Sequence, residues 1–247
     1  KFLHPYTPRL HIRGAVSDGN TEFSLMSSKT TIGYPEKQGL YDPANEKDSC
    51  GVGFVANMKG VPNHQIVLDA LQMLMNMEHR GACGCEPNTG DGAGILVGLP
   101  EGFLRKVAMD DLGVDLPQKG RFGAGLIFLP KIEDERKKCI KVVEAIIAEQ
   151  GQQCLGWRKV PVETEAANVG PAACAAEPYI MQLFIGAADE LEGDDFERQL
   201  YIIRKRASHQ LRFDETLEQR LLFYICSLST KVMIYKGMLN TAQVIQY

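Results

Sequence analysis

The feature that most constrains this chain is a cysteine followed by two flexible glycines within a β-favouring run. The run reads Cys50-Gly51-Val52-Gly53-Phe54. Its composition predicts a strand over residues 51–57 with the cysteine at its tip. If the bond between Ser49 and Cys50 is cut, the thiol and a free α-amine share one residue. Such an amine has a pKa of about 7.7–8.0 and can act as the base for the thiol. The pattern therefore predicts both a nucleophile and a maturation step.

Composition and charge narrow the class of protein. The 247 residues are 45% hydrophobic and 23% charged, which is typical of a soluble globular protein with a substantial core. A formal net charge of −4 gives no reason to expect a nucleic acid or an anionic membrane as partner. No apolar run approaches the roughly 20 residues that a membrane span needs. Seven cysteines, an odd number spread along the chain, favour a reducing compartment over a disulfide framework.

The N-terminal residues differ from the rest. Residues 1–40 lack apolar periodicity and are rich in Ser, Thr, Gly, Pro and basic groups, so we expect residues 1–49 to be a disordered or removed leader or propeptide. Met26 is a candidate true start. Residues 1–15 contain basic groups and no acids, which leaves a transit peptide open. A start at Met26 indicates the cytoplasm, and a real transit segment indicates a plastid.

From Cys50 onward the hydrophobic pattern is regular. Helices are predicted over residues 64–78, 101–111, 133–150 and 194–209. Strands are predicted over residues 51–57, 94–99, 122–129, 154–162, 179–185, 223–228 and 232–235. The last two strands flank the turn Ser229-Thr230-Lys231, which by spacing predicts a hairpin, and residues 163–177 are expected to be a loop. Because helices and strands come in clusters rather than in strict alternation, the pattern favours an α+β fold over a doubly wound sheet.

Each candidate motif, taken singly, has a simpler structural interpretation. Cys50 could be a small buried hydrophobe, and Arg80 could favour the negative end of a helix dipole. The glycine-rich segment Asn88–Ile95 precedes a strand rather than a helix, so we do not expect a phosphate-binding loop. Cys83 and Cys85 are one residue apart and have no second pair, so no metal site is expected there.

Together, the motifs are far more specific, and the chain resembles the class II glutamine amidotransferases. It most resembles the amino end of the glutamate synthase family, and the resemblance covers residues 39–247. The segments that carry it are Gly39-Leu40-Tyr41-Asp42-Pro43, Asp48-Ser49-Cys50-Gly51-Val52-Gly53-Phe54, His79-Arg80-Gly81-Ala82-Cys83-Gly84, Thr89-Gly90-Asp91-Gly92-Ala93-Gly94-Ile95, Tyr201-Ile202-Ile203-Arg204-Lys205-Arg206, Phe223-Tyr224-Ile225-Cys226-Ser227-Leu228-Ser229 and Tyr235-Lys236-Gly237-Met238-Leu239.

The resemblance implies a fold and a site. The fold is a four-layer α-β-β-α sandwich of the N-terminal-nucleophile hydrolase type, occupying residues 50–247. The site uses Cys50, freed by cleavage after Ser49, as the nucleophile that hydrolyses glutamine, and Arg80 helps to hold that nucleophile in place. Four further residues are implied to form the structural loops near the site: Gly51, Asp91, Gly92 and Gly94.

The resemblance also implies partners beyond this segment. Ammonia from glutamine passes to the remaining domains of the same polypeptide, where 2-oxoglutarate is converted to a second glutamate. FMN, an iron–sulfur cluster and NAD(P)H or ferredoxin serve that second reaction. None of these cofactors is expected to bind within the present segment.

Two family motifs are missing from the sequence. A pattern like His-Asn-Gly-Glu, which supplies the oxyanion hole, and a pattern like His-x-Arg-Phe-Ser, which holds the substrate carboxylate, normally follow the segment that ends at Leu239. Removing one oxyanion donor costs ~10²–10³ in rate, so we expect residues 50–247 to be a partial domain, truncated on its C-terminal side and inactive alone. Three alternatives remain open at this point: another class II amidotransferase, an inactive fragment or regulatory paralogue in which Cys50 is structural, and a metal-binding module on Cys83 and Cys85.

Overall fold

The computed structural model describes residues 37–40, 42, 51–78, 86–188 and 191–247. The chain divides into two units, residues 1–47 and residues 48–247. In the first unit, the Nζ atom of Lys37 lies 2.8 Å from a carboxylate oxygen of Asp42. All the helices and strands described below belong to the second unit. None of the described helices combines the length and apolar character needed to cross a membrane.

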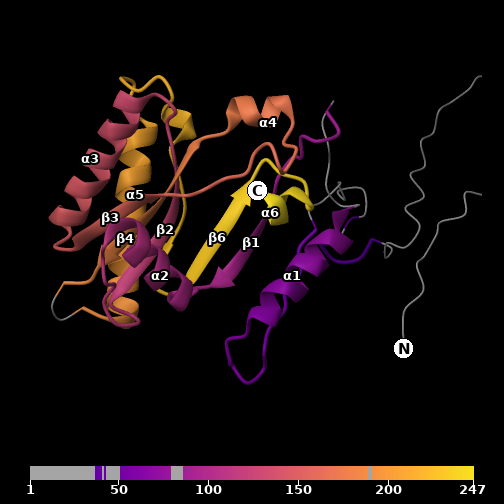
Figure 1. Cartoon of the computed structure of the whole chain (residues 1–247), viewed down its shortest axis with the longest axis horizontal. Helices are drawn as coiled ribbons and strands as arrows, with labels where there is room; N and C mark the ends of the chain where they lie inside the picture. The colour runs from indigo at the N-terminus through magenta and orange to yellow at the C-terminus, as the bar shows by residue number, and fades with distance from the viewer. Residues whose placement is uncertain (1–36, 41, 43–50, 79–85, 189–190) are drawn as a thin grey trace, which may run out of the picture. The chain divides into compact units, whose positions relative to one another are not determined.

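A four-stranded antiparallel sheet forms the centre of the second unit (Figure 1). Its strand order is β3-β4-β2-β5. The bounds are Phe122–Leu129 for β2, Gln153–Lys159 for β3, Tyr179–Gly186 for β4 and Tyr224–Ser229 for β5. Strands β2 and β4 are almost wholly buried, because helices or strands cover both faces of the sheet.

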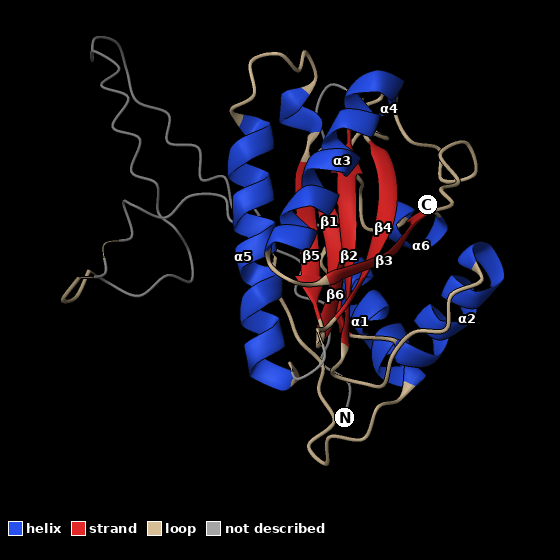
Figure 2. Ribbon diagram, turned by 90° about the vertical axis from the view of Figure 1, so that its left-hand side faces the viewer, coloured by secondary structure: helices blue, strands red, loops and turns tan. Residues whose placement is uncertain are grey.

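Two long helices cover one face of this sheet (Figure 2). They are α3 (Glu133–Glu149) and α5 (Gly193–Arg212). The buried side chains of α5 recur every three or four residues, so they form one apolar stripe along the helix; they are Phe196, Leu200, Ile203, Ala207 and Leu211. Fully burying a large apolar side chain contributes ~1.5–3 kcal/mol. This stripe therefore anchors α5 to the sheet.

A second, two-stranded sheet faces the other side. It pairs β1 (Ala93–Gly98) antiparallel with β6 (Val232–Gly237). Between the two sheets lies a second apolar cluster, to which α2 (Glu101–Leu112) contributes Leu104 and Ala108. Helix α1 (His64–Asn76) packs near β1 and has no fully buried residue. Its first turn is capped by Asn63, whose side-chain oxygen accepts a hydrogen bond of 2.8 Å from the backbone N–H of Gln65.

The order of layers runs from α3 and α5, through the four-stranded sheet and the two-stranded sheet, to α1 (Figure 1). This arrangement agrees with the predicted α+β class and with the α-β-β-α layering of N-terminal-nucleophile hydrolases. The predicted helices and most predicted strands are also present, with ends that differ by a few residues.

Two local predictions were wrong, and two short helices were missed. Residues 51–57 are not a strand: Val52 and Phe54 are each 90% exposed, and a strand requires a hydrogen-bonded partner that this segment does not have among the described residues. The predicted loop over residues 163–177 contains α4 (Pro171–Ala176), because proline suits the first helical turn and alanine favours the helix. Two short helices near the C-terminal end, η3 (Arg220–Leu222) and α6 (Gln243–Gln246), were not predicted.

The predicted hairpin is also wrong, and the error matters for the fold. Strand β5 pairs with β2, whereas β6 pairs with β1, so the turn between them carries the chain from one sheet to the other. Glu197 of α5 holds this turn. Its carboxylate accepts hydrogen bonds from the Ser229 hydroxyl at 2.6 Å, and from the N–H and hydroxyl of Thr230 at 2.8 and 2.7 Å.

Candidate functional site

The structure describes only some of the predicted site residues. The predicted nucleophile Cys50, the cleavage residue Ser49 and the supporting Arg80 lie outside the described residues, as do Cys83 and Cys85. The four predicted loop residues are described: Gly51, Asp91, Gly92 and Gly94. The site is therefore built from the chain on either side of the nucleophile and of Arg80.

A groove of about 1150 Å³ adjoins the first described residue after the nucleophile. One wall is the extended segment that begins at Gly51 together with α1, and the other is β1 from Gly94 onward. Thr230 and Lys231, from the turn that joins the two sheets, also line the groove. The structure thus brings Gly51 and Gly94 to one groove, although 42 positions separate them in the sequence numbering.

The glycines before and within β1 permit close contact with the C-terminal segment. A Cβ atom on Gly90 would lie 2.5 Å from the backbone carbonyl of Leu239. A Cβ atom on Gly94 would lie 2.6 Å from the carbonyl oxygen of Tyr235. Both obstacles are backbone atoms, which cannot rotate away, so only glycine fits at these positions without a shift of the chain. The close approach is made to β6 and to the residues that follow it.

Asp91 and Gly92 border a different cavity, of about 440 Å³. Its walls are mainly apolar, and charged groups at its edge include Arg212 and Lys236. Lys236 donates a hydrogen bond of 3.1 Å from its Nζ atom to the Tyr224 hydroxyl. The four predicted loop residues therefore do not share one cavity: Gly51 and Gly94 line the groove, and Asp91 and Gly92 line this second space.

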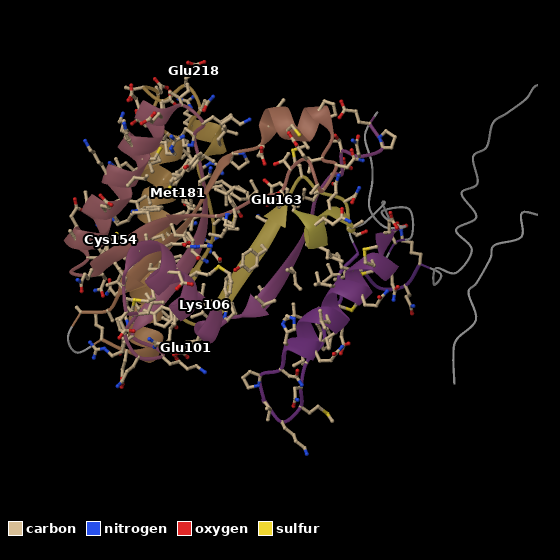
Figure 3. The ribbon with its side chains drawn as sticks, viewed as in Figure 1. Glu101, Lys106, Cys154, Glu163, Met181 and Glu218 are labelled. Carbon is tan, nitrogen blue, oxygen red and sulfur yellow. The ribbon has the colours of Figure 1, made fainter. Side chains whose placement is uncertain are left out.

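The described cysteines are not candidates for a nucleophile. Burial raises the pKa of Cys139 and Cys226 to about 12, and that of Cys154 to about 11. Cys154 lies on β3 of the four-stranded sheet, at the side of the unit away from α1 in Figure 3. The Cys174 thiol donates a hydrogen bond to the Val169 carbonyl at 3.3 Å. Because a thiolate is the reactive form, the three thiols with raised pKa values are unreactive near neutral pH.

The described part of the chain contains no group of side chains suited to bind a metal ion. Among those residues, no three His, Cys, Asp or Glu side chains are grouped so that they could hold a metal ion. The described cysteines are dispersed, two of them in different apolar clusters. These residues therefore do not fit an iron–sulfur cluster, which requires several converging thiolates.

Sequence reasoning missed one polar residue, Gln243, that joins the C-terminal segment to Asn88. Gln243 is 3% exposed and forms a reciprocal pair with Asn240: each side-chain oxygen accepts from the other residue's backbone N–H, at 2.8 and 3.0 Å. The Asn-x-x-Gln spacing is that of a capping box. That signal was present in the sequence and predicts a short helix at this position.

Comparisons with known proteins complete the description of the site. The chain is 44% identical to the Glutamate synthase [NADPH] large chain of Bacillus subtilis over 211 residues, which cover 85% of this chain and 13% of that protein. It is 41% identical to Glutamate synthase [NADH] of Saccharomyces cerevisiae over 243 residues, which cover 95% of this chain and 11% of the relative. It is 38% identical to the Ferredoxin-dependent glutamate synthase 1, chloroplastic/mitochondrial, of Arabidopsis thaliana over 207 residues, which cover 84% of this chain and 12% of that protein.

These matches thus span only 11 to 13% of the length of the three relatives. The family model of the class-II glutamine amidotransferases matches residues 50–247. Its first matched residue is Cys50. The chain therefore belongs to the class-II glutamine amidotransferases.

Proposed function

We propose that this chain is the glutaminase part of a glutamate synthase. The observation that carries the proposal is the family match over residues 50–247, which starts at the cysteine that sequence chemistry singles out as a nucleophile. Relatives named glutamate synthase, 34 to 44% identical over most of this chain, support the same assignment.

The reaction is the hydrolysis of glutamine to glutamate and ammonia. After cleavage behind Ser49, the α-amine of Cys50 accepts the thiol proton, and the sulfur attacks the side-chain amide carbon of glutamine. The C–N bond breaks and ammonia leaves with the proton it needs. Water then attacks the thioester, which releases glutamate and restores the thiol.

The neighbouring residues have supporting roles in this proposal. Arg80 is assigned the role of helping to hold the nucleophile in place, and residues 1–49 are assigned as the propeptide that cleavage removes. Gly51, the residue after the nucleophile in the sequence, and Gly94 border one groove. Asp91 and Gly92 shape the turn that leads into β1, where Gly92 adopts a φ of +141°, a backbone conformation that favours glycine.

Ammonia is used elsewhere in the full-length protein. We propose that the remaining domains combine it with 2-oxoglutarate and reduce the product to a second glutamate, with FMN, an iron–sulfur cluster and NAD(P)H or ferredoxin supplying the electrons. We propose that these groups bind in other domains of the full-length protein. The names of the relatives include NADPH, NADH and ferredoxin, and the choice among these donors is made outside this segment.

The first experiment tests the cleavage after Ser49 and the reactivity of Cys50 together. The full-length protein is analysed by intact mass and N-terminal sequencing, before and after treatment with a glutamine-mimicking covalent inhibitor. We expect a mature chain that begins at Cys50 and carries one adduct on that residue. Cys50→Ser should abolish the adduct and lower glutamine hydrolysis by ~10³-fold or more, since it removes the nucleophile.

Cys174→Ser provides the matched control, because Cys174 is a partly exposed thiol outside the groove. It should leave both the adduct and the hydrolysis rate unchanged. A chain that retains Ser49, takes up no adduct and hydrolyses no glutamine would contradict the proposal and make Cys50 a structural cysteine.

A further inference from the structure

One buried side-chain amide joins three segments that are far apart in the sequence. The Nε2 atom of Gln243 donates hydrogen bonds to the carbonyl oxygens of Asn88, at 2.9 Å, and Asn168, at 3.0 Å. Its Oε1 atom accepts from the backbone N–H of Asn240 at 2.8 Å. Both donor positions of the NH₂ group and the carbonyl oxygen thus have a backbone partner. Gln243 belongs to α6, and its side chain is 3% exposed.

The segment that Gln243 holds is the one that leads into β1. The Asn88 carbonyl also accepts a hydrogen bond of 2.9 Å from the N–H of Gly170, and Gly90 packs directly against the backbone of Leu239. The backbone of residues 88–90 is therefore fixed at two points. The C-terminal segment supplies a contact at each point, through Gln243 at Asn88 and through Leu239 at Gly90, and Gly170 supplies a further one at Asn88.

This segment connects two parts of the proposed site. It follows residues 79–85, which contain Arg80, and it continues through Asp91 into β1. In β1, Gly94 borders the same groove as Gly51, the residue next to Cys50. A shift of the backbone at Asn88 would be passed along a short stretch of chain in both directions. Displacements of about 1 Å at reacting groups can cost ~100-fold in rate.

Only a carboxamide can make this set of contacts. The group must donate twice and accept once, which matches the NH₂ and C=O of glutamine. An ionised glutamate can only accept, so its oxygen would face the carbonyl oxygens of Asn88 and Asn168. Burial and these carbonyl groups would both disfavour the charged form. A glutamate at this position would regain one donated hydrogen bond only when it is protonated.

We propose that Gln243 is a positioning residue for glutamine hydrolysis, acting through the backbone of residues 88–94 and not through contact with the substrate. This inference rests on the proposed glutaminase function. It adds a residue from the C-terminal segment to a site otherwise built from Cys50 and Arg80.

The test compares Gln243→Glu with Gln246→Glu in the full-length protein. Gln246 is exposed on the same short helix, so the control makes the same chemical change outside the buried network. Glutamine-dependent glutamate formation is measured for kcat and KM between about pH 6 and pH 8, and ammonia-dependent formation is measured in parallel. Ammonia bypasses the glutamine site and reports on the rest of the protein.

We expect Gln243→Glu to lower glutamine-dependent kcat/KM by ~10- to 100-fold at the upper end of this range. The loss should shrink as the pH falls, because protonation of the new carboxyl restores a donor. Ammonia-dependent activity should match that of the wild type. Gln246→Glu should behave as the wild type in both assays.

Gln243→Asn provides a second variant that does not depend on a buried charge. It keeps the amide but is one methylene shorter, so it should lower kcat/KM for glutamine without the pH-dependent recovery. If Gln243→Glu does not fold, this variant decides the question together with hydrogen exchange of the amides in residues 88–94, which should exchange faster than in the wild type.

Two results would overturn the inference while leaving the proposed function intact. One is an active wild type whose kcat, KM and pH profile are unchanged in the Gln243 variants. The other is an equal loss of glutamine- and ammonia-dependent activity with a lower melting temperature and no recovery at low pH, which would make Gln243 merely structural. A wild type without glutamine hydrolysis would instead refute the proposed function, and the inference with it.

Discussion

The two sheets of the second unit differ in how completely they are packed. In the four-stranded sheet, β2 is buried along almost its whole length and α5 presents a fully buried stripe. In the two-stranded sheet, half-buried and exposed residues alternate along β1, where Leu96 is 61% exposed, and α1 has no buried residue. One sheet therefore carries most of the hydrophobic stabilisation of this unit.

Two of the predicted loop residues lie on the less packed side. Gly51 and Gly94 border the groove between α1 and β1, and the described thiols with raised pKa values are distributed over the packed core and β3. Regions that bind and react commonly have lower local stability than the core that supports them. The comparison indicates that the most buried core and the groove lie in different layers of this unit.

The largest expected difference comes from shortening one leucine in each region. Leu200→Ala removes a side chain with 0% exposure from α5 and should lower the opening free energy of the β2 amides by ~2–5 kcal/mol. Leu68→Ala changes an α1 side chain that is 46% exposed and should change the same quantity by ~0.5 kcal/mol or less. Native-state hydrogen exchange of the full-length protein measures both. Equal effects would mean that the two layers are one cooperative core.

A smaller effect is expected from adding one methyl group at Gly90, where the backbone before β1 packs against the backbone of Leu239. Gly90→Ala would place its Cβ atom 2.5 Å from the Leu239 carbonyl, and such overpacking typically costs ~1–3 kcal/mol. Gly98→Ala is the matched control, because nothing lies within 4 Å of its Cβ position. Thermal unfolding and glutamine hydrolysis should both decline for Gly90→Ala. A pair of variants with the same melting temperature would contradict the close approach.

The smallest effect concerns acid stability on the packed side. The Lys138 ammonium and the Thr216 hydroxyl and N–H hydrogen-bond to Asp214 and lower its pKa to about 2. A folded-state pKa below the unfolded value of about 3.9 stabilises the fold above about pH 4, and this stabilisation is lost as the pH falls through about 2. Asp214→Asn should therefore lower the melting temperature slightly above pH 4, and the difference should vanish near pH 2. A difference that persists at pH 2 would show that the charge is not its cause.

Local sequence patterns predicted the elements better than their partners. The run at 122–129 predicted β2 with its observed bounds, because glycine and proline mark both ends of a continuous apolar segment. Strands were also predicted over residues 223–228 and 232–235, close to β5 and β6, but their separation into two sheets was not. A three-residue turn fixes the distance between two strands and says nothing about which other strands they meet.

In the candidate site, too, the sequence indicated individual residues but not the atoms that they contact. The sequence indicated a structural role for the glycines at 90, 92 and 94, because glycine permits tight turns and close approach of two backbone segments. The identity of the atoms they approach was not, since Leu239 and Tyr235 come from the far end of the chain. Gln243 had a visible capping pattern, but its contacts with Asn88 and Asn168 depend on three segments that meet only in the folded protein.

The pairing of β1 with β6 has a consequence for synthesis in the cell. Strand β1 ends at Gly98, and the partner that covers its edge begins at Val232. A ribosome adds ~5–20 residues per second, so a nascent β1 spends on the order of ten seconds without that partner. During this interval its unpaired backbone is open to contacts with other chains. A chaperone that shields this strand until β6 emerges would raise the yield of folded protein without altering its final stability.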